Sequence, residues 1–323
     1  MEDNYNSEKE PLENKFEIEN NLRQSEQPSV IKILLIAVGL FFLGQIVAGI
    51  VAVVASQISG IDWQILASKT KIENTLSNRS FLRFTIFWSQ VLSFIVPAII
   101  VLQYYYKKDW LNALGLNKFP NWKLVSLSIV FLLVSIPLVQ YSVELNKLIP
   151  LPAYLKSMES STDEMLKAML KKDFFYEIVI NVILIGIIPA IGEELMFRGV
   201  LQQQIGRWIR NNHVMVWITA AIFSAIHFQF EGFLPRMVLG AVLGYLFVWT
   251  KNIWLPMLVH LFNNAAQVVA IYALGIKPED ADKIGSDKPM NWAFALASIF
   301  MMILLARVIQ NEANKKPILM DEQ

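Results

Sequence analysis

The 323-residue chain contains no cysteine. That absence excludes a disulfide scaffold, a thiolate metal site and a cysteine nucleophile. Charged residues are also scarce, at 17% of the chain, whereas a soluble globular protein has about 25%. The formal net charge is only +1 and no basic block dominates. Recognition of nucleic acid by charge is therefore excluded as well.

Apolar residues dominate the chain instead. Hydrophobic residues make up 55% of it, and the mean hydropathy is +0.44. Intrinsic disorder as the main state is excluded, because disorder needs low hydrophobicity and high net charge. The 20 Phe and 9 Trp suit a polytopic membrane protein, in which aromatic rings gather near the interfaces.

Long apolar runs divide the chain into candidate spans. A helix needs about 20 mostly apolar residues to cross a bilayer. Eight stretches qualify, at about 31–56, 81–103, 122–143, 178–197, 214–230, 233–250, 253–274 and 292–308. The fifth and sixth are short and closely spaced, so they are the ones most prone to stop before crossing fully. We expect an all-α transmembrane bundle of about eight spans.

Composition separates four parts of the chain. Residues 1–30 carry eight acidic and three basic residues, and we expect a disordered acidic tail there rather than a secretory signal, which starts basic and turns apolar. Residues 31–175 hold three spans and an amphipathic connection. Residues 176–275 hold four spans, and residues 276–323 hold the last span and a polar tail.

The connection after the third span has the pattern of an amphipathic helix. Ser161 followed by Glu164 matches a capping box at a helix start. The apolar residues behind it lie beside lysines, which is typical of a helix on the membrane surface. An ordinary solvated linker helix fits the same pattern.

Ionisable groups are concentrated in one apolar block. Between residues 178 and 278 there are only three acidic residues, Glu193, Glu194 and Glu231. The chain has three histidines, and two of them, His227 and His260, fall inside or at the end of apolar spans. Ionisable residues inside a membrane are costly, so they mark a candidate functional site.

The first motif in this block runs from Glu193 to Arg198. On a helix, Glu194 and Arg198 are four residues apart and can form an ion pair. Glu193 points about 100° away from Glu194, so it lacks that partner and suits the task of a general base. The alternative is an interfacial charge pair that marks the end of a span.

Two further motifs follow. His227 ends the fifth span, and Glu231 one turn later is interpreted as a loop acid rather than as a partner of His227. His260 and Asn264 are one turn apart in the seventh span and face the same way. Hydrogen bonds between helices are the structural alternative for that pair.

Together these motifs resemble a known family. Glu-Glu-x-x-x-Arg, Phe-x-x-x-His and His-x-x-x-Asn, in this order on consecutive spans, are similar to the CAAX protease and bacteriocin-processing family of intramembrane endopeptidases, also called the Abi family. This group includes the type II CAAX prenyl endopeptidase and many bacterial members. The resemblance covers about residues 178–273 and makes residues 176–275 the expected catalytic core.

The resemblance implies roles for six residues. It makes Glu193 the water-activating carboxylate, with His227 beside it. His260 and Asn264 would stabilise the oxyanion, and Glu194 and Arg198 would support the site. The family is conventionally called a metalloprotease, for which Glu193, His227 and His260 would supply three zinc ligands and leave a fourth position open. A metal-free glutamate mechanism is also proposed for it, and the His-Glu-x-x-His motif of common zinc proteases is absent here.

The expected function is hydrolysis of a peptide bond in a membrane-associated substrate. Suitable substrates are a peptide or a membrane-protein segment, with or without a lipid group. The expected location is the bilayer of the bacterial inner membrane. One alternative is a non-enzymatic immunity or scaffold protein on the same fold. A proton-relaying transporter is another, but it predicts repeated halves, and no internal repeat is apparent.

Overall fold

The computed structural model describes residues 28–61, 75–276 and 290–315. Within these ranges the regular structure is helical throughout, without strands. The first half contains α2 (Val30–Ser59), α4 (Leu76–Gln90), η1 (Val91–Ile95), α5 (Val96–Tyr106), η2 (Lys107–Asp109), α6 (Trp110–Ala113), α7 (Trp122–Lys147) and α8 (Ala153–Leu170). The second half contains α9 (Tyr176–Asn181), η3 (Val182–Ile187), α10 (Ile188–Glu194), η4 (Leu195–Gln202), α11 (Gln203–Trp208), α12 (Asn212–Ala225), η5 (Phe230–Gly232), α13 (Phe233–Thr250), α14 (Trp254–Ala273) and α15 (Trp292–Ala313).

Seven helices in the described part of the chain are long and apolar enough to cross a membrane. The fifth expected span, at 214–230, corresponds to α12, which has 14 residues and is too short to cross alone. The expected all-α bundle of about eight spans is thus confirmed, with one of its short central stretches reduced to a partial crossing.

The fourth span is longer than the sequence predicts. It was expected to end near residue 197, but α9 to α11 form one helix from Tyr176 to Trp208. The hydropathy pattern stops at Arg198 because that residue is polar, yet Arg198 is fully buried by neighbouring helices. The Glu193–Arg198 motif therefore lies within a helix and does not mark its end.

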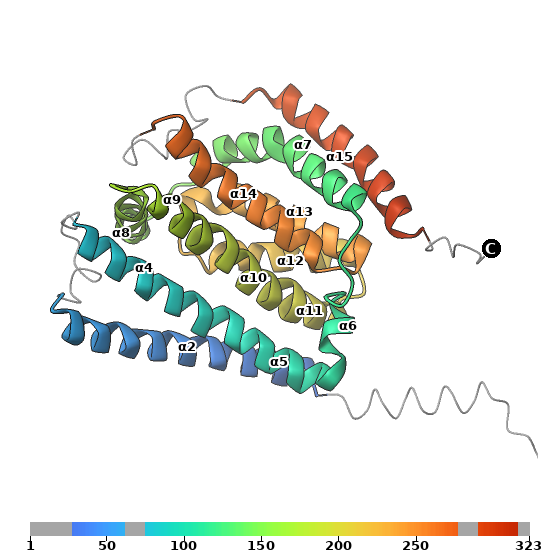
Figure 1. The fold of residues 1–323 in the computed structure, drawn as a ribbon. Helices are drawn as coiled ribbons and strands as arrows, with labels where there is room; N and C mark the ends of the chain where they lie inside the picture. The colour runs from blue at the N-terminus through green and yellow to red at the C-terminus, as the bar shows by residue number, and fades with distance from the viewer. Residues whose placement is uncertain (1–27, 62–74, 277–289, 316–323) are drawn as a thin grey trace, which may run out of the picture.

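The helices form successive layers (Figure 1). Helices α2 and α4–α5 lie along one edge, next to the long helix α9–α11. Helices α12, α13 and α14 occupy the centre, and α7 and α15 form the opposite edge. Gly44 permits the close approach of α2 to η1, since a Cβ there would overlap the Leu92 carbonyl.

Helix α8 crosses the end of this bundle and is seen end-on in Figure 1. It begins at Ala153, directly after Pro152, so the predicted start at Ser161 is wrong. Serine is tolerated inside a helix at modest cost, and the capping pattern alone cannot exclude a turn that starts earlier. Met169 and Leu170 are buried against the bundle, so α8 packs on protein as well as facing outward.

Residues 1–27 of the expected acidic tail lie outside the described residues. Residues 277–289, which precede α15, lie outside them as well.

Candidate active site

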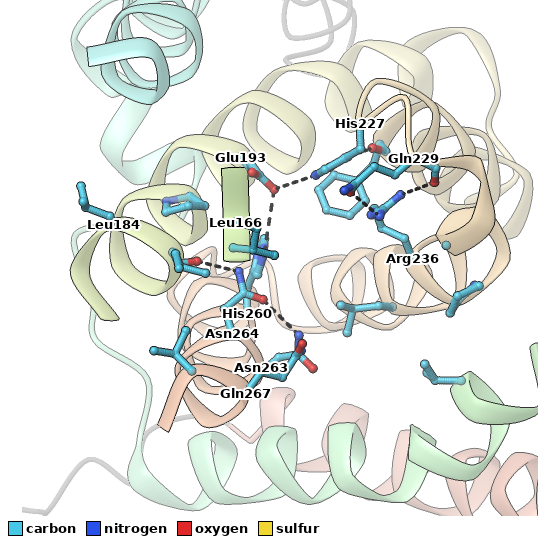
Figure 2. A pocket seen from close by; sticks show the side chains of 18 of the residues that line it. Leu166, Leu184, Glu193, His227, Gln229, Arg236, His260, Asn263, Asn264 and Gln267 are labelled. Atoms are coloured by element: carbon cyan, nitrogen blue, oxygen red, sulfur yellow. Dashed lines mark hydrogen bonds and ion pairs between the residues drawn. The ribbon is translucent and has the colours of Figure 1, made fainter. Parts of the chain in front are cut away.

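A cavity of about 590 Å³ lies between α8, α10, α13 and α14. Apolar residues from several helices line much of it, with Leu132, Ile136, Met165 and Leu184 among them. Polar groups also reach the cavity from four separate segments, as Figure 2 shows. These are Glu193, His227, Gln229, Arg236, His260, Asn263, Asn264 and Gln267.

Glu193 lies among these polar groups. Its carboxylate is supplied by α10 and is only 5% exposed. Glu193 Oε2 lies 4.0 Å from His227 Nε2 and 3.9 Å from His260 Nε2. Those distances exceed a direct hydrogen bond. Both imidazole nitrogens therefore face the same carboxylate oxygen from about one water's distance.

Glu194 faces the opposite way and is fully bonded on one oxygen. Its Oε1 accepts hydrogen bonds from Arg198 Nη1 at 2.7 Å and His260 Nδ1 at 2.8 Å. Arg198 also donates to the Gly240 carbonyl at 2.8 Å, and its guanidinium lies over the Phe223 ring. Glu194 thus ties α10 to α14 and, through Arg198, to α13.

The bonds of the two Nδ1 atoms fix the orientation of both imidazoles. His227 Nδ1 lies 2.8 Å from the Phe223 carbonyl, which can only accept, so Nδ1 carries the proton. That carbonyl is free because α12 ends at Ala225, and helix ends leave carbonyls without partners. His260 Nδ1 likewise donates to Glu194. The Nε2 atom of each ring therefore faces the Glu193 carboxylate.

Helix α12 ends earlier than predicted, which places His227 in the turn after it. Glu231 lies exposed in η5, and its backbone N–H donates to the Glu159 carboxylate. The interpretation of Glu231 as a loop acid agrees with this position, because the Phe223 carbonyl, not Glu231, orients the His227 ring.

Asn264 faces the cavity but has a structural bond. Its Nδ2 donates to the Ile185 carbonyl at 3.0 Å, and its Oδ1 accepts from Asn263 Nδ2 at 3.1 Å. A regular helix would pair the Ile185 carbonyl with the amide of residue 189, but residue 189 is proline and has no N–H. Asn264 replaces that missing donor and keeps a second N–H for other use.

Glu193, His227 and His260 have the residue types of a zinc site but not its spacing. Tetrahedral ligands about 2.0–2.1 Å from zinc lie about 3.4 Å apart, whereas Glu193 Oε2 is 3.9 and 4.0 Å from the two imidazoles. Over the described ranges, no group of three His, Asp or Glu is arranged to hold a metal ion. As placed, the donors do not fit tetrahedral zinc, but a water about 2.8 Å from Glu193 Oε2 and from either imidazole fits the observed separations.

Sequence reasoning missed Arg236, which lines the same cavity. It is the only charged residue of α13, so the rule that singled out the other intramembrane charges also applied to it. A second buried cluster was missed as well, because Arg79 and Glu177 belong to segments 98 residues apart in sequence.

The family described as type II CAAX prenyl endopeptidase Rce1-like matches residues 175–266. A relative named uncharacterized protein YpbD, from Bacillus subtilis, is 31% identical over 99 residues, which are 29% of this chain and 48% of YpbD. The membrane-embedded CAAX protease MroQ, from Staphylococcus aureus, is 26% identical over 98 residues, which are 29% of this chain and 40% of MroQ.

The chain thus spans about half or less of the curated relatives it matches, and no solved structure matches it significantly. The matched segment contains the cavity-lining residues Glu193, His227, Arg236, His260 and Asn264. Both relatives are bacterial, which agrees with the expected location. The chain is a multi-pass integral membrane protein whose residues 175–266 are similar to the Rce1-like type II CAAX prenyl endopeptidase family.

Proposed function

We propose that this protein is an intramembrane endopeptidase in which Glu193 activates a water molecule. The observation that carries the proposal is the position beside Glu193 Oε2, with the Nε2 atoms of His227 and His260 at 4.0 and 3.9 Å. A water there can donate one hydrogen to the carboxylate and the other to an imidazole. In the low-polarity surroundings of the cavity, such a carboxylate suits general-base catalysis.

The reaction then follows the ordinary course of peptide hydrolysis. Glu193 takes a proton from the water while the water oxygen attacks the scissile carbonyl carbon. His227 accepts the second hydrogen bond and holds the water in line. The tetrahedral intermediate collapses as the C–N bond breaks, and Glu193 gives its proton to the departing amine nitrogen.

His260 and Asn264 are the proposed oxyanion donors. His260 can donate from Nε2 when it carries two protons, and the Glu194 carboxylate on Nδ1 stabilises that charged ring. Asn264 uses one N–H on the Ile185 carbonyl and has the second for substrate. Losing one such donor costs about 2.7–4 kcal/mol of transition-state stabilisation.

The proposed mechanism uses no metal, because the donor spacing suits a water. The substrate is a peptide or membrane-protein segment, with or without a lipid group, that enters from the bilayer. The apolar lining residues of the cavity, Leu132, Ile136 and Leu184 among them, give an apolar side chain or lipid a place to pack. A scaffold protein on the same fold would bind such a segment without cutting it.

The test is cleavage by the purified full-length protein in lipid nanodiscs. A peptide library, with and without lipidated cysteine, is incubated with wild type and with Glu193→Gln, each with and without a chelator. Arg210→Gln is the matched control, since Arg210 is exposed outside the cavity. We expect cleavage by wild type and Arg210→Gln, no cleavage by Glu193→Gln, and no effect of the chelator.

Other outcomes would overturn parts of this proposal. Binding without cleavage by wild type would favour the scaffold. Loss of activity with the chelator and its return with zinc would replace the metal-free mechanism with a zinc-dependent one.

A further inference from the structure

Arg236 places a positive charge in the cavity that holds Glu193. It is the fourth residue of α13, and in the view of Figure 2 it lies beyond His227 as seen from Glu193. All three residues line the one cavity. A substrate bound for hydrolysis at Glu193 would therefore reach the Arg236 guanidinium.

Neutral groups hold the guanidinium in place. Arg236 Nη1 donates to the Gln229 carbonyl at 3.0 Å, and Nη2 donates to Gln229 Oε1 at 2.9 Å. Gly232 leaves room for the fork, because a Cβ there would lie 3.1 Å from Nη2. Arginine has five N–H donors. The two bonds to Gln229 therefore fix the direction of the guanidinium and leave other N–H donors for a ligand.

No carboxylate in the described ranges forms an ion pair with Arg236. The arginines that are fully buried in the described bundle differ, since Arg198 pairs with Glu194, and Arg79 and Arg83 pair with Glu177. Glu159 and Glu193 are close enough to act on the Arg236 charge electrostatically. Arg236 is half-buried and lines the cavity, so a ligand in the cavity can supply the carboxylate partner that the described residues do not.

We propose that Arg236 binds a carboxylate of the peptide substrate and thereby determines which bond reaches Glu193. This inference rests on the proposed peptidase function. A guanidinium fork held along one edge suits bidentate recognition of a carboxylate. Two sources share that chemistry, the C-terminal carboxylate of a peptide and the side chain of Asp or Glu. Arg236 is in either case a specificity-determining residue, because it touches the substrate away from the scissile bond.

The experiment uses a peptide that wild type cleaves, remade in three forms. The first has a free C-terminal carboxylate, the second a C-terminal amide, and the third an amide with one Asp moved stepwise along the residues after the cleaved bond. We measure kcat/KM for wild type, Arg236→Gln, Arg236→Lys and the control Arg210→Gln in nanodiscs. A charge-assisted pair is expected to favour the carboxylate-bearing form about ten- to a hundredfold.

The expected pattern is specific to Arg236. Wild type and Arg210→Gln prefer one carboxylate form, Arg236→Gln loses that preference while still cleaving the amide, and Arg236→Lys keeps a smaller preference. The form that is preferred identifies the source. Equal preference in wild type and Arg236→Gln overturns the inference but leaves the peptidase function intact, since cleavage itself continues.

A binding measurement decides the matter even without turnover. Tripeptide acids and the matching tripeptide amides are added to Glu193→Gln protein, and thermal stabilisation is recorded. We expect stabilisation by the acids alone, abolished in the double variant Glu193→Gln/Arg236→Gln. Equal responses to acids and amides, or an unchanged response in the double variant, would contradict carboxylate binding by Arg236.

Discussion

Two buried charged clusters occupy this bundle, and they are built in opposite ways. The anchoring cluster consists of Arg79, Arg83, Asp173, Glu177 and Asn181, and the cavity cluster consists of Glu193, Glu194, Arg198, His227 and His260. In the first cluster Glu177 accepts from both arginines and from the backbone N–H groups of residues 173 and 174. In the second, Glu193 has no direct donor among the described contacts.

The anchoring cluster fastens the end of α8. Arg83 Nη2 and Asn181 Nδ2 both donate to the Met169 carbonyl, at 3.0 and 2.8 Å. Tyr272 donates to the Leu170 carbonyl at 2.7 Å. These acceptors are terminal carbonyls of α8, which a helix cannot satisfy itself. The cluster therefore holds the helix that covers the cavity.

The comparison separates a stabilising charge cluster from a reactive one. A carboxylate with four donors is held in its charged form and has little capacity left for a substrate. A carboxylate that faces two imidazoles across an open position can take and return a proton. Burial is common to both clusters, so hydrogen-bond saturation, not burial, distinguishes their roles.

Glu193→Gln is expected to have the largest effect on activity. The amide keeps the size of the side chain but removes the base, so kcat/KM should fall by about 10²- to 10⁴-fold or more. The melting temperature should stay close to wild type, because Glu193 has no direct partner to lose. Peptide cleavage at matched amounts of folded protein checks this. Full activity in this variant would contradict the enzyme interpretation.

Glu194→Gln tests a carboxylate that has both tasks, because Glu194 pairs with a buried arginine and also orients a cavity histidine. It removes the counter-charge of the buried Arg198, so the free energy of unfolding should drop by about 3–5 kcal/mol. It also weakens the bond that orients His260, and we expect reduced but measurable turnover. Thermal melting and cleavage are measured on the same sample. A well-folded, inactive Glu194→Gln beside an active Glu193→Gln would reverse the two assignments.

Glu177→Gln should affect stability far more than activity. Two buried arginines lose their shared carboxylate, which should lower the free energy of unfolding by about 3 kcal/mol. Turnover per folded molecule should fall by less than tenfold at a temperature below the transition. Lys147→Gln is the control, since its ion pair with Glu144 is exposed. A stable but inactive Glu177→Gln would place this cluster in the reaction.

Asn264→Ala is expected to destabilise the protein less than the two changes that remove the carboxylate partner of a buried arginine, and it separates two tasks of one side chain. It leaves the Ile185 carbonyl without its donor and should cost about 1–3 kcal/mol. Pro189→Ala restores a backbone N–H at the position that a helix would use, so the double variant should regain stability. Activity should remain low in the double variant if Asn264 serves the oxyanion. Recovery of both properties would leave Asn264 only a structural role.

The apolar runs of the sequence determined most of the fold. The spans expected at 233–250 and 253–274 agree closely with α13 and α14, because burial of continuous apolar helix in lipid depends on neighbouring residues in the chain. The apolar runs also identified Glu193, His227 and His260 as candidate functional residues, because ionisable groups are costly inside a membrane. Local pairing also predicted the Glu194–Arg198 contact, which spans one helical turn.

Contacts between distant segments were decided only by the tertiary structure. The extension of the fourth span to Trp208, the bond from Asn264 to Ile185 and the pairing of Arg79 with Glu177 depend on which helices become neighbours. Hydropathy along the chain cannot show whether a polar group will find a partner 98 residues away. A buried charge is therefore visible in the sequence, but its hydrogen-bond partners, and so its role, are set by helix packing.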